Sequence, residues 1–319
     1  MSFFQPAPGT VLTHDIADYP DGIVLPIDKP YRWTSADVIR KVKFAAFRHF
    51  RKKNLKVGHA GTLDPLATGV LLVCLGPACK RAQEFQDHDK EYVAGIRFGA
   101  TTPSYDLEKE VDRTFPYDRV TEDAVRAVLP SFLGPQEQVA PLFSAKSVDG
   151  VRAYEMARKL YRNAQKGILD PDFDAAALET LHRSRITISE LELLDYVEAS
   201  AVPDKSACGA SANGVGQNFF DLFSGEKILV REVTADAQNT VNSASSRINV
   251  ADTSSLGLPE ARIRIACSKG TYIRAFARDL GEALGTGAHL SGLVRTKTGA
   301  FRLEDALSLE EALDLLASD

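Results

Sequence analysis

The sequence has few cysteines, and none of them is placed as in a disulfide scaffold or a zinc site. The 319 residues include four cysteines, of which Cys74 and Cys79 are five positions apart while Cys208 and Cys267 stand alone. Neither spacing matches a zinc-binding motif, and a chain of this length can bury a large core without cross-links. We therefore expect reduced thiols, as in cytoplasmic proteins.

Long apolar segments are also scarce. The longest uninterrupted apolar run, residues 70–75, is far shorter than the roughly 20 residues that cross a membrane as a helix. The first 22 residues have neither the basic start nor the apolar centre of a signal peptide. The sequence thus predicts a cytoplasmic protein without a membrane segment.

Several common catalytic motifs do not occur. The sequence has no GxxxxGK[ST] loop for nucleotide phosphates and no GxSxG turn for a serine nucleophile. Its six histidines do not have the HExxH spacing of zinc hydrolases. We therefore expect neither a metal ion nor an organic cofactor.

Charge is distributed unevenly along the chain. There are 38 Lys and Arg against 43 Asp and Glu, a net charge of −5, which excludes a uniformly basic coat for nucleic acids. Residues 40–56, however, contain eight basic side chains and no acidic one. Such a run is often only the solvated face of a helix, although a local basic patch can also contact phosphates.

Apolar periodicity predicts strands and helices without a regular β–α–β rhythm. Strands are expected at 22–28, at the end of 61–76, and at 90–99, 185–195 and 261–267. Helices are expected behind Thr34 or Ser35, from Pro77 to about Gln86, after Thr121, from Val151 with Tyr154, Ala157 and Leu160, over 272–284, and after Ser308. This pattern is typical of an α+β fold with a mixed, mostly antiparallel sheet flanked by helices.

Composition changes at residues 197–257. This stretch is rich in Ala, Ser, Asn, Gly and Asp, apart from an apolar island at 218–233. Its segments 207–216 and 239–246 offer too little apolar surface to offset the entropy of ordering the chain. Although the length is compatible with two domains, we expect a single domain over 1–319 that carries a flexible insertion at 197–257.

Two segments contain residues suited to catalysis. In residues 58–69 (GHAGTLDPLATG), three glycines, a proline and two threonines surround one carboxylate, Asp64, at the entry to an apolar strand. A carboxylate beside the core needs a partner to stay ionised. Arg274, at the start of a helix with an inward-facing apolar stripe, is the second candidate. Taken singly, Asp64 is more simply a turn residue and Arg274 a surface residue.

Together the two segments resemble the TruB family of pseudouridine synthases, the enzymes that make pseudouridine 55 in the TΨC loop of transfer RNA. GHAGTLDPLATGVL is similar to the signature loop of the family. Four further blocks occur in the family's order: IDKPYRWTSADVIRKVK (27–43), KEYVAGIRFGATTPSYDLE (90–108), QVAPLFSAKSVDGVRAYEMAR (138–158) and CSKGTYIRAFARDLGEALGTGAHLSGLVRTKTGAF (267–301). The resemblance therefore extends along most of the chain.

The resemblance implies a pseudouridine-synthase fold with a central RNA-binding cleft. The implied reaction acts on a uridine flipped out of tRNA: the N1–C1′ bond breaks, the uracil turns, and a C5–C1′ bond forms. Asp64 matches the family's nucleophilic aspartate, Arg274 matches the arginine that pairs with it, and Tyr92 matches the tyrosine that stacks on the base and assists catalysis. The residues implied to hold the flipped nucleotide are His59, Tyr92, Tyr272 and Leu293.

The resemblance also gives the basic segment a role. It precedes the signature loop, where RNA backbone must pass, so we expect phosphate contacts from Arg40, Lys41, Lys43, Arg51, Lys52, Lys53 and Lys56. The expected partner is tRNA, through its TΨC stem-loop, with no cofactor and no obligatory protein partner, and a monomer is expected. Lys29, near the loop, is expected to be structural.

The chain departs from the family pattern at several positions. Arg32 stands where glycine is usual, Leu142 replaces a proline, Lys146 and Ser147 are in swapped order, and Val294 occupies a position where arginine is common. The segment 197–257 is far longer than the usual link. Only about twenty residues follow the last block, which predicts that the PUA-type RNA-binding domain of many relatives is absent.

Three other functions are weighed against this one. A synthase acting on another RNA, including the guide-directed branch, would normally have the PUA domain and a basic tail. A non-catalytic RNA-binding or tRNA-folding protein is disfavoured by the presence of Asp64, Tyr92 and Arg274. An aspartyl-phosphate hydrolase based on Asp64 would need a second acidic residue two positions on, where Leu66 stands.

Overall fold

The computed structural model describes most of the chain outside two long segments. The described residues are 3–6, 9–141, 147–148, 151–152, 183–200, 248 and 250–317. Leu142 and Lys146, the helix positions Tyr154, Ala157 and Leu160, and the central part of the expected insertion, 201–247, lie outside them.

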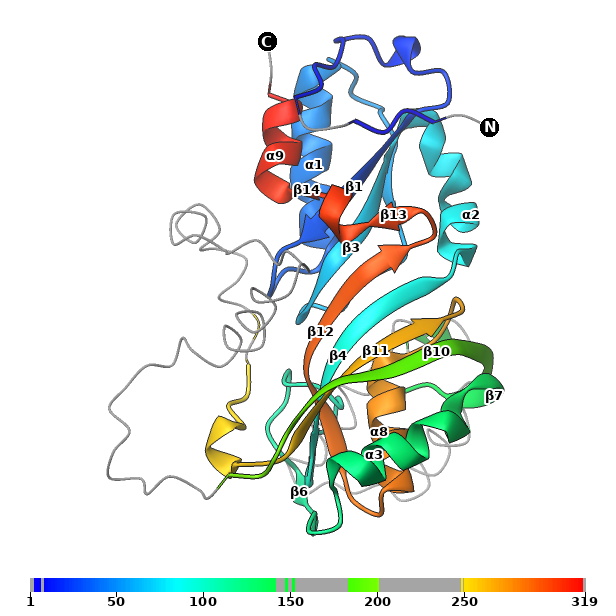
Figure 1. The fold of residues 1–319 in the computed structure, drawn as a ribbon. Helices are drawn as coiled ribbons and strands as arrows, with labels where there is room; N and C mark the ends of the chain where they lie inside the picture. Colours follow the sequence, from blue (N-terminus) through cyan, green and yellow to red (C-terminus); the bar gives the residue numbers. More distant parts are fainter. Residues whose placement is uncertain are drawn as a thin grey trace.

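A ten-stranded sheet forms the centre of the molecule (Figure 1). Its strands follow the order β14-β1-β3-β12-β4-β11-β10-β7, while β2 pairs with β3 and β13 with β12. In this order the bounds are Leu307–Ser308, Ile23–Lys29, Ala67–Leu75, Ala288–Thr298, Lys90–Phe98, Glu260–Cys267, Arg183–Val197 and Gly134–Val139, with β2 at Val57–Ala60 and β13 at Phe301–Arg302. Neighbouring strands are antiparallel except in the pairs β1–β14 and β3–β12. The expected mixed, mostly antiparallel sheet is confirmed.

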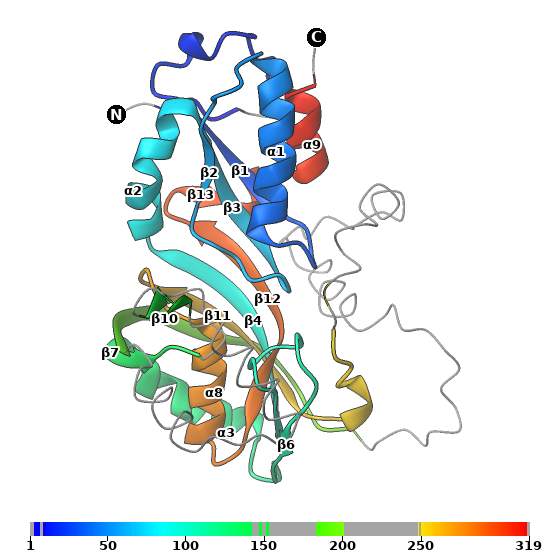
Figure 2. The same ribbon diagram turned by 180° about the vertical axis from the view of Figure 1, so that it is seen from behind.

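Strands β12 and β4 run through the middle of the sheet and join its two halves (Figure 1 and Figure 2). In one half, β1, β2 and β3 lie beside α1 (Ser35–His49), α2 (Ala82–Asp87) and α9 (Leu309–Leu315). In the other half, β7, β10 and β11 lie beside α3 (Glu122–Val128) and α8 (Ile273–Ala283). Helices therefore flank the sheet at both ends, as expected for an α+β fold.

Helix α1 begins where the sequence predicts it. Thr34 is the N-cap residue: its side chain accepts the N–H of Asp37, and the Asp37 carboxylate accepts the N–H of Thr34. This reciprocal pair satisfies two backbone donors that the first turn of a helix leaves unpaired. Val38, Val42 and Ala46 are fully buried, which confirms the predicted apolar stripe.

The predicted helix signals near the C-terminal end are also confirmed. Helix α8 is followed by Gly285 with a φ of +71°, the left-handed conformation that favours glycine after a helix. Helix α9 is capped by Ser308, whose side chain and backbone N–H exchange hydrogen bonds with Glu311. Local sequence chemistry thus sets both boundaries.

The helix predicted from Pro77 is present, whereas the helix predicted from Val151 does not start there. The chain after Pro77 first forms a 3₁₀ helix, Gly76–Arg81, and becomes α-helical only at α2. Val151 starts no helix, because it pairs with Val148 in the two-stranded sheet of β8 (Ser147–Val148) and β9 (Val151–Arg152). The two intervening residues are Asp and Gly, a pair typical of tight hairpin turns that the helical interpretation overlooked.

The described ends of the segment 197–257 belong to the folded body. Strand β10 continues to Val197, and a 3₁₀ helix occupies Ser254–Leu256. Ala251 and Thr253 are each only 1% exposed. The N–H of Ala251 donates to the carbonyl of Leu107 at 2.8 Å, so this end of the segment is hydrogen-bonded to the chain next to Asp106.

The close pairing of β3 with β12 depends on a glycine. Gly69 has a φ of +98°, and a Cβ built on it would lie 2.2 Å from the carbonyl oxygen of Arg295 on the neighbouring strand. Its N–H donates to the Asp28 carboxylate at 3.0 Å. Any larger residue at this position would push β12 away from β3. Strand β3 begins directly after the loop that carries Asp64.

We expect Gly69→Ala to lower the free energy of unfolding by about 2–4 kcal/mol, because it adds both a backbone clash and a strained φ. The matched control is Gly58→Ala on β2, where an added Cβ meets nothing within 4 Å and φ is not left-handed. Urea unfolding of both variants measures the difference. Equal stability of the two variants would contradict this account of the pairing between β3 and β12.

Candidate functional site

The structure brings Asp64 and Arg274 together from positions 210 residues apart in the sequence. Asp64 lies in the loop that enters β3, and Arg274 lies in the first turn of α8. The Nε of Arg274 donates to Oδ2 of Asp64 at 2.9 Å. The arginine side chain is 6% exposed and that of the aspartate 41%. The pair therefore combines a buried cation with a carboxylate that solvent or a substrate can reach.

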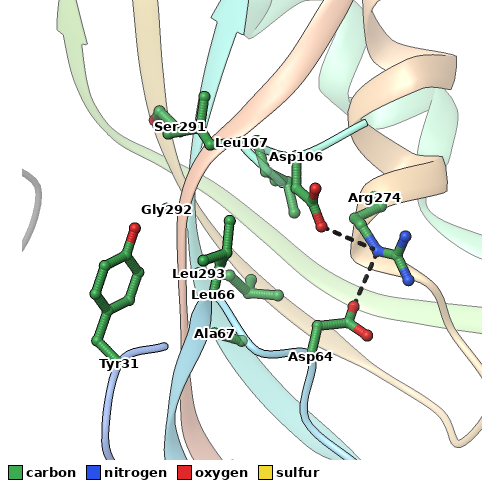
Figure 3. Close-up of a pocket in the computed structure, with 11 residues that line it drawn as sticks. Tyr31, Asp64, Leu66, Ala67, Asp106, Leu107, Arg274, Ser291, Gly292 and Leu293 are labelled. Atoms are coloured by element: carbon green, nitrogen blue, oxygen red, sulfur yellow. Dashed lines mark hydrogen bonds and ion pairs between the residues drawn. The ribbon is translucent and has the colours of Figure 1, made fainter. Parts of the chain in front are cut away.

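A second carboxylate, which the sequence analysis missed, completes this group. Asp106 places its Oδ2 3.7 Å from the Nε of Arg274. Its other oxygen accepts hydrogen bonds from the Ser104 hydroxyl at 2.6 Å and from the N–H of Glu108 at 2.9 Å. Arg274 also donates to the carbonyl of Ser104 at 3.1 Å. Both carboxylates thus approach the same nitrogen of the guanidinium, and the Asp106 turn helps to fix it beside Asp64 (Figure 3).

Burial and charge compete in setting the ionisation of this group. Burial raises the pKa of Asp106, the positive charge of Arg274 opposes this rise, and the charge of Asp64 adds to it. Burial by itself would lower the pKa of Arg274, but Asp64, Asp106 and Glu108 together raise that pKa above its ordinary value. The arginine is therefore held as a permanent cation between two acids.

A buried lysine holds the backbone next to Asp64. Lys29 is 0% exposed, and its Nζ donates to the carbonyl oxygens of Trp33 at 2.6 Å, Pro30 at 2.9 Å and Pro65 at 3.2 Å. The amine thus ties the end of β1 to the residue that follows Asp64. This placement agrees with the structural role expected for Lys29.

Two further side chains anchor the same loop. The hydroxyl of Ser35, at the start of α1, accepts the N–H of Leu63 and donates to its carbonyl, both at 3.0 Å. Arg295 on β12, 1% exposed, donates to the carbonyl of Val70 at 2.7 Å and to that of Gly61 at 3.1 Å. The loop is therefore fixed on both sides of its carboxylate by buried polar groups.

A small cavity lies beside the ion pair (Figure 3). Its volume is about 20 Å³, enough for roughly one water molecule and too small for a uracil ring. The residues that line it are Tyr31, Asp64, Leu66, Ala67, Asp106, Leu107, Arg274, Leu290, Ser291, Gly292 and Leu293. The space in this structure is thus too narrow to hold a base, although the Asp64 side chain at its edge is 41% exposed.

Tyr92 does not line this cavity. It is 8% exposed, belongs to the main hydrophobic cluster, and lies opposite Arg295 in the pairing of β4 with β12. Burial raises the pKa of its phenol, and the nearby Arg295 opposes that rise. The ring therefore packs in the core beside the site, and its stacking on a base stays a prediction for an opened pocket.

The other expected binding residues are placed differently from one another. Leu293 lines the cavity, and its contact with uracil stays a prediction. His59 on β2 is partly buried, with a pKa lowered by burial and by Arg295, and does not line it. Tyr272 caps α8, where its N–H and carbonyl pair with the side-chain amide of Gln138, and it too lies outside the cavity lining.

The basic segment lies on the surface of α1 and the turn that follows it. The seven side chains expected to contact phosphates are exposed: Arg40, Lys41, Lys43, Arg51, Lys52, Lys53 and Lys56. Two neighbouring cations lie over exposed or half-buried aromatic rings, Lys43 over Phe47 and Arg48 over Phe44. The structure thus exposes positive charge on α1 and on the turn that follows it.

Two features are absent from the described part of the chain, a group of metal ligands and a membrane-spanning helix. Among its residues, no three histidine, cysteine, aspartate or glutamate side chains are grouped as a metal site. None of the helices described there has the length and apolarity needed to cross a bilayer.

Sequence comparison identifies the family. A profile of the TruB family pseudouridylate synthase N-terminal domain matches residues 48–167, and a profile of the tRNA pseudouridylate synthase B C-terminal domain matches residues 274–319. The chain belongs to the TruB family. Asp64 falls within the first match, and Arg274 begins the second.

Curated TruB proteins match nearly the whole chain. The chain is 41% identical over 293 residues to tRNA pseudouridine synthase B of Phocaeicola vulgatus and 42% identical over 293 residues to that of Bacteroides thetaiotaomicron, and each match covers 92% of both proteins. The enzyme of the same name from Deinococcus deserti is 36% identical over 90% of this chain and 77% of its own.

A solved structure confirms the pseudouridine-synthase fold. The crystal structure of a Cbf5-Nop10-Gar1 complex contains a chain that matches 92% of this TruB chain with a TM-score of 0.51 and 22% identity. The match covers 54% of that chain, so the TruB chain spans about half of its length. At this identity the similarity concerns the fold alone.

We expect Lys29 to make stability rise with pH above neutrality. Burial lowers the pKa of Lys29 to about 7, against the opposing effect of Asp28 and Asp64, from an ordinary value of 10.5. Between these values the unfolded chain binds a proton that the folded chain has released, so unfolding becomes less favourable as pH rises, by up to about 1.4 kcal/mol per pH unit.

Urea unfolding at pH 7, 8 and 9 tests this against Lys29→Met, which keeps the length of the side chain. The unfolding free energy of wild type minus that of Lys29→Met should increase from pH 7 to pH 9. Taking the difference cancels the contribution of groups common to both proteins. Parallel pH curves would mean that the lysine keeps an ordinary pKa when folded.

Proposed function

We propose that this TruB protein converts uridine 55 in the TΨC loop of tRNA into pseudouridine. The single observation that carries the proposal is the Asp64–Arg274 pair, a reachable carboxylate on a buried guanidinium at the edge of a cavity. The family membership and the names of the curated relatives support tRNA as the substrate. The position within tRNA follows from the resemblance of the signature loop.

The reaction rearranges one nucleotide and adds nothing to it. The N1–C1′ bond breaks, the uracil turns within the site, and C5 bonds to C1′ with loss of the C5 proton. Asp64 acts as the nucleophile, and attack at C1′, attack at the base, or elimination at the sugar all require it ionised. The Nε of Arg274 donates to the Asp64 carboxylate at 2.9 Å, so a positive charge lies beside the proposed nucleophile.

Substrate entry requires the cavity to open. Flipping a nucleotide out of the loop costs a few kcal/mol of lost stacking, which contacts in the site must offset. Leu293 lies on the cavity wall, and Tyr92 lies close behind it in the core. In our proposal these residues, with His59 and Tyr272, hold the uracil once the lining side chains have moved apart.

The exposed basic segment binds the tRNA backbone. Phosphate contacts neutralise charge and release counterions, so they increase affinity at low salt without regard to base sequence. A strongly charged local face permits this although the whole protein carries −5. This proposal assigns the segment to binding and the Asp64 loop to chemistry.

We expect Asp64→Asn to abolish product formation, by about 10³-fold or more, because the amide keeps the size of the side chain but cannot act as the nucleophile. The measurement is site-mapped pseudouridine in an unmodified tRNA transcript, with and without EDTA. Wild type should form product in both conditions.

The matched control is Asp118→Asn, at an exposed aspartate, which should leave the rate unchanged. Binding of the transcript without product by wild type would support the non-catalytic RNA-binding alternative. Product at a different uridine, or only in another RNA, would overturn the proposed position. Loss of wild-type activity in EDTA would point to a metal-dependent reaction instead.

We expect the replacement of Lys41, Lys52 and Lys53 by glutamate to raise KM for tRNA more than it lowers kcat. In our proposal these exposed side chains contact only the phosphate backbone of the RNA. The salt dependence of KM should also weaken. The control reverses three exposed arginines far along the sequence from the basic segment, Arg113, Arg119 and Arg126, with the same change in net charge. Equal effects of the two triple variants would show that only total charge matters.

A further inference from the structure

The mouth of the cavity lies between two side chains. Of the described residues that line it, Tyr31 and Asp64 are partly exposed, and the other nine are buried. Figure 3 shows the Tyr31 ring on the side of the cavity opposite the Asp64–Arg274 pair. A base that enters must therefore pass between the aromatic ring and the carboxylate. Tyr31 is also the only aromatic residue among the described lining residues.

The backbone next to Tyr31 is strained. Arg32 has a φ of +63°, in the left-handed region that favours glycine, and it stands where the TruB family usually has glycine. Tyr105, next to the lining residue Asp106, has a φ of +57°. Strained conformations of this kind persist where the surrounding structure fixes them, and they concentrate at functional sites.

One interaction that fixes Arg32 comes from the far end of the long insertion. Its guanidinium donates to the carbonyl of Ile248 at 2.7 Å. Three residues further on, Ala251 donates to the carbonyl of Leu107, which lines the cavity. We call residues 248 and 250–253 the strap. The strap is thus bonded to the rim of the cavity both beside Tyr31 and at Leu107.

The inner end of the strap is anchored in the core. The hydroxyl of Thr253, 1% exposed, accepts a hydrogen bond from Arg97 at 2.7 Å. Arg97 also pairs with Glu260 at 2.7 Å, and Glu260 accepts from Ser291, which lines the cavity, at 2.8 Å. The strap therefore has a fixed base from which it can hold the Tyr31 side of the mouth.

We propose that Tyr31 stacks on the target nucleotide from the side opposite Asp64, and that Arg32, bonded to the strap, is the positioning residue that holds the Tyr31 ring there. This inference rests on the proposed function. It assigns a substrate contact to a residue for which the family motif specifies no side chain. It also joins two departures from the family pattern, the arginine at 32 and the long segment 197–257, through one hydrogen bond.

The chemistry of Tyr31 suits this role. Burial raises the pKa of its phenol to about 12, so the ring stays neutral and does not repel a phosphate or a carboxylate. Aromatic stacking accepts any base face and is typically worth enough to change binding by about 5- to 150-fold. Such a contact on the open side of the pocket would compensate for the stacking that the flipped base loses.

The test of Tyr31 compares two substitutions on an unmodified tRNA transcript. Tyr31→Leu keeps apolar bulk but removes the aromatic face, and it should lower kcat/KM by about 5- to 150-fold. Tyr31→Phe keeps the face and should stay within about twofold of wild type. Equal losses in both variants, or no loss in Tyr31→Leu, would overturn the stacking role.

The test of Arg32 uses Arg32→Gly, which suits the backbone conformation but removes the bond to Ile248. We expect an unchanged Tm and a KM raised about threefold or more at nearly constant kcat. In the Tyr31→Leu background the same substitution should have no further effect, because Arg32 acts through the ring. Additive losses, or a fall in Tm that accounts for the loss, would overturn the positioning role.

A binding measurement separates this inference from the proposed function. If wild type forms no pseudouridine, the proposed function fails, and the affinity of each protein for the transcript then decides the inference. Tyr31→Leu should bind more weakly than Tyr31→Phe in this measurement as well. Equal affinities would overturn the contact, whereas weaker binding would support it independently of catalysis.

Discussion

The guanidinium of Arg274 is the charge on which the site depends. It lies between the reachable carboxylate of Asp64 and the buried carboxylate of Asp106, and without it two acids would share a confined space with no cation between them. Because Asp106 is buried and held by Ser104, the carboxylate that a substrate can reach is that of Asp64. The Asp64–Arg274 pair links the loop before β3 to α8. The two halves of the sheet therefore meet at the reacting group.

Much of the fold was predictable because its signals are local. The capping pair at Thr34, the apolar stripe of α1 and the alternation in β11 each depend on neighbours a few residues away, and the structure has all three. Long-range pairing carries no such signal. The order of strands in the sheet was therefore not predicted. The pairing of Val151 with Val148 was missed for another reason, because the Asp and Gly between them in the sequence are a local hairpin signal that was overlooked.

The candidate site was predictable where a motif names its residues and not where geometry alone selects them. The resemblance paired Asp64 with Arg274, and the structure places them in contact. Asp106 lay within a quoted block, yet only the folded turn shows that it faces Arg274. Tyr31 occupies a position that the motif leaves open, so nothing in the sequence marked it as part of the cavity wall. The closure of the cavity depends on side-chain packing, which no pattern encodes.

Arg295 has a mechanical consequence. Strand β12 passes through both halves of the sheet. Its Arg295 donates hydrogen bonds to the carbonyls of Gly61 and Val70, on either side of Asp64. A shift of β12 would therefore move the backbone of the loop that carries Asp64, because two hydrogen bonds from one buried guanidinium connect the strand to that loop.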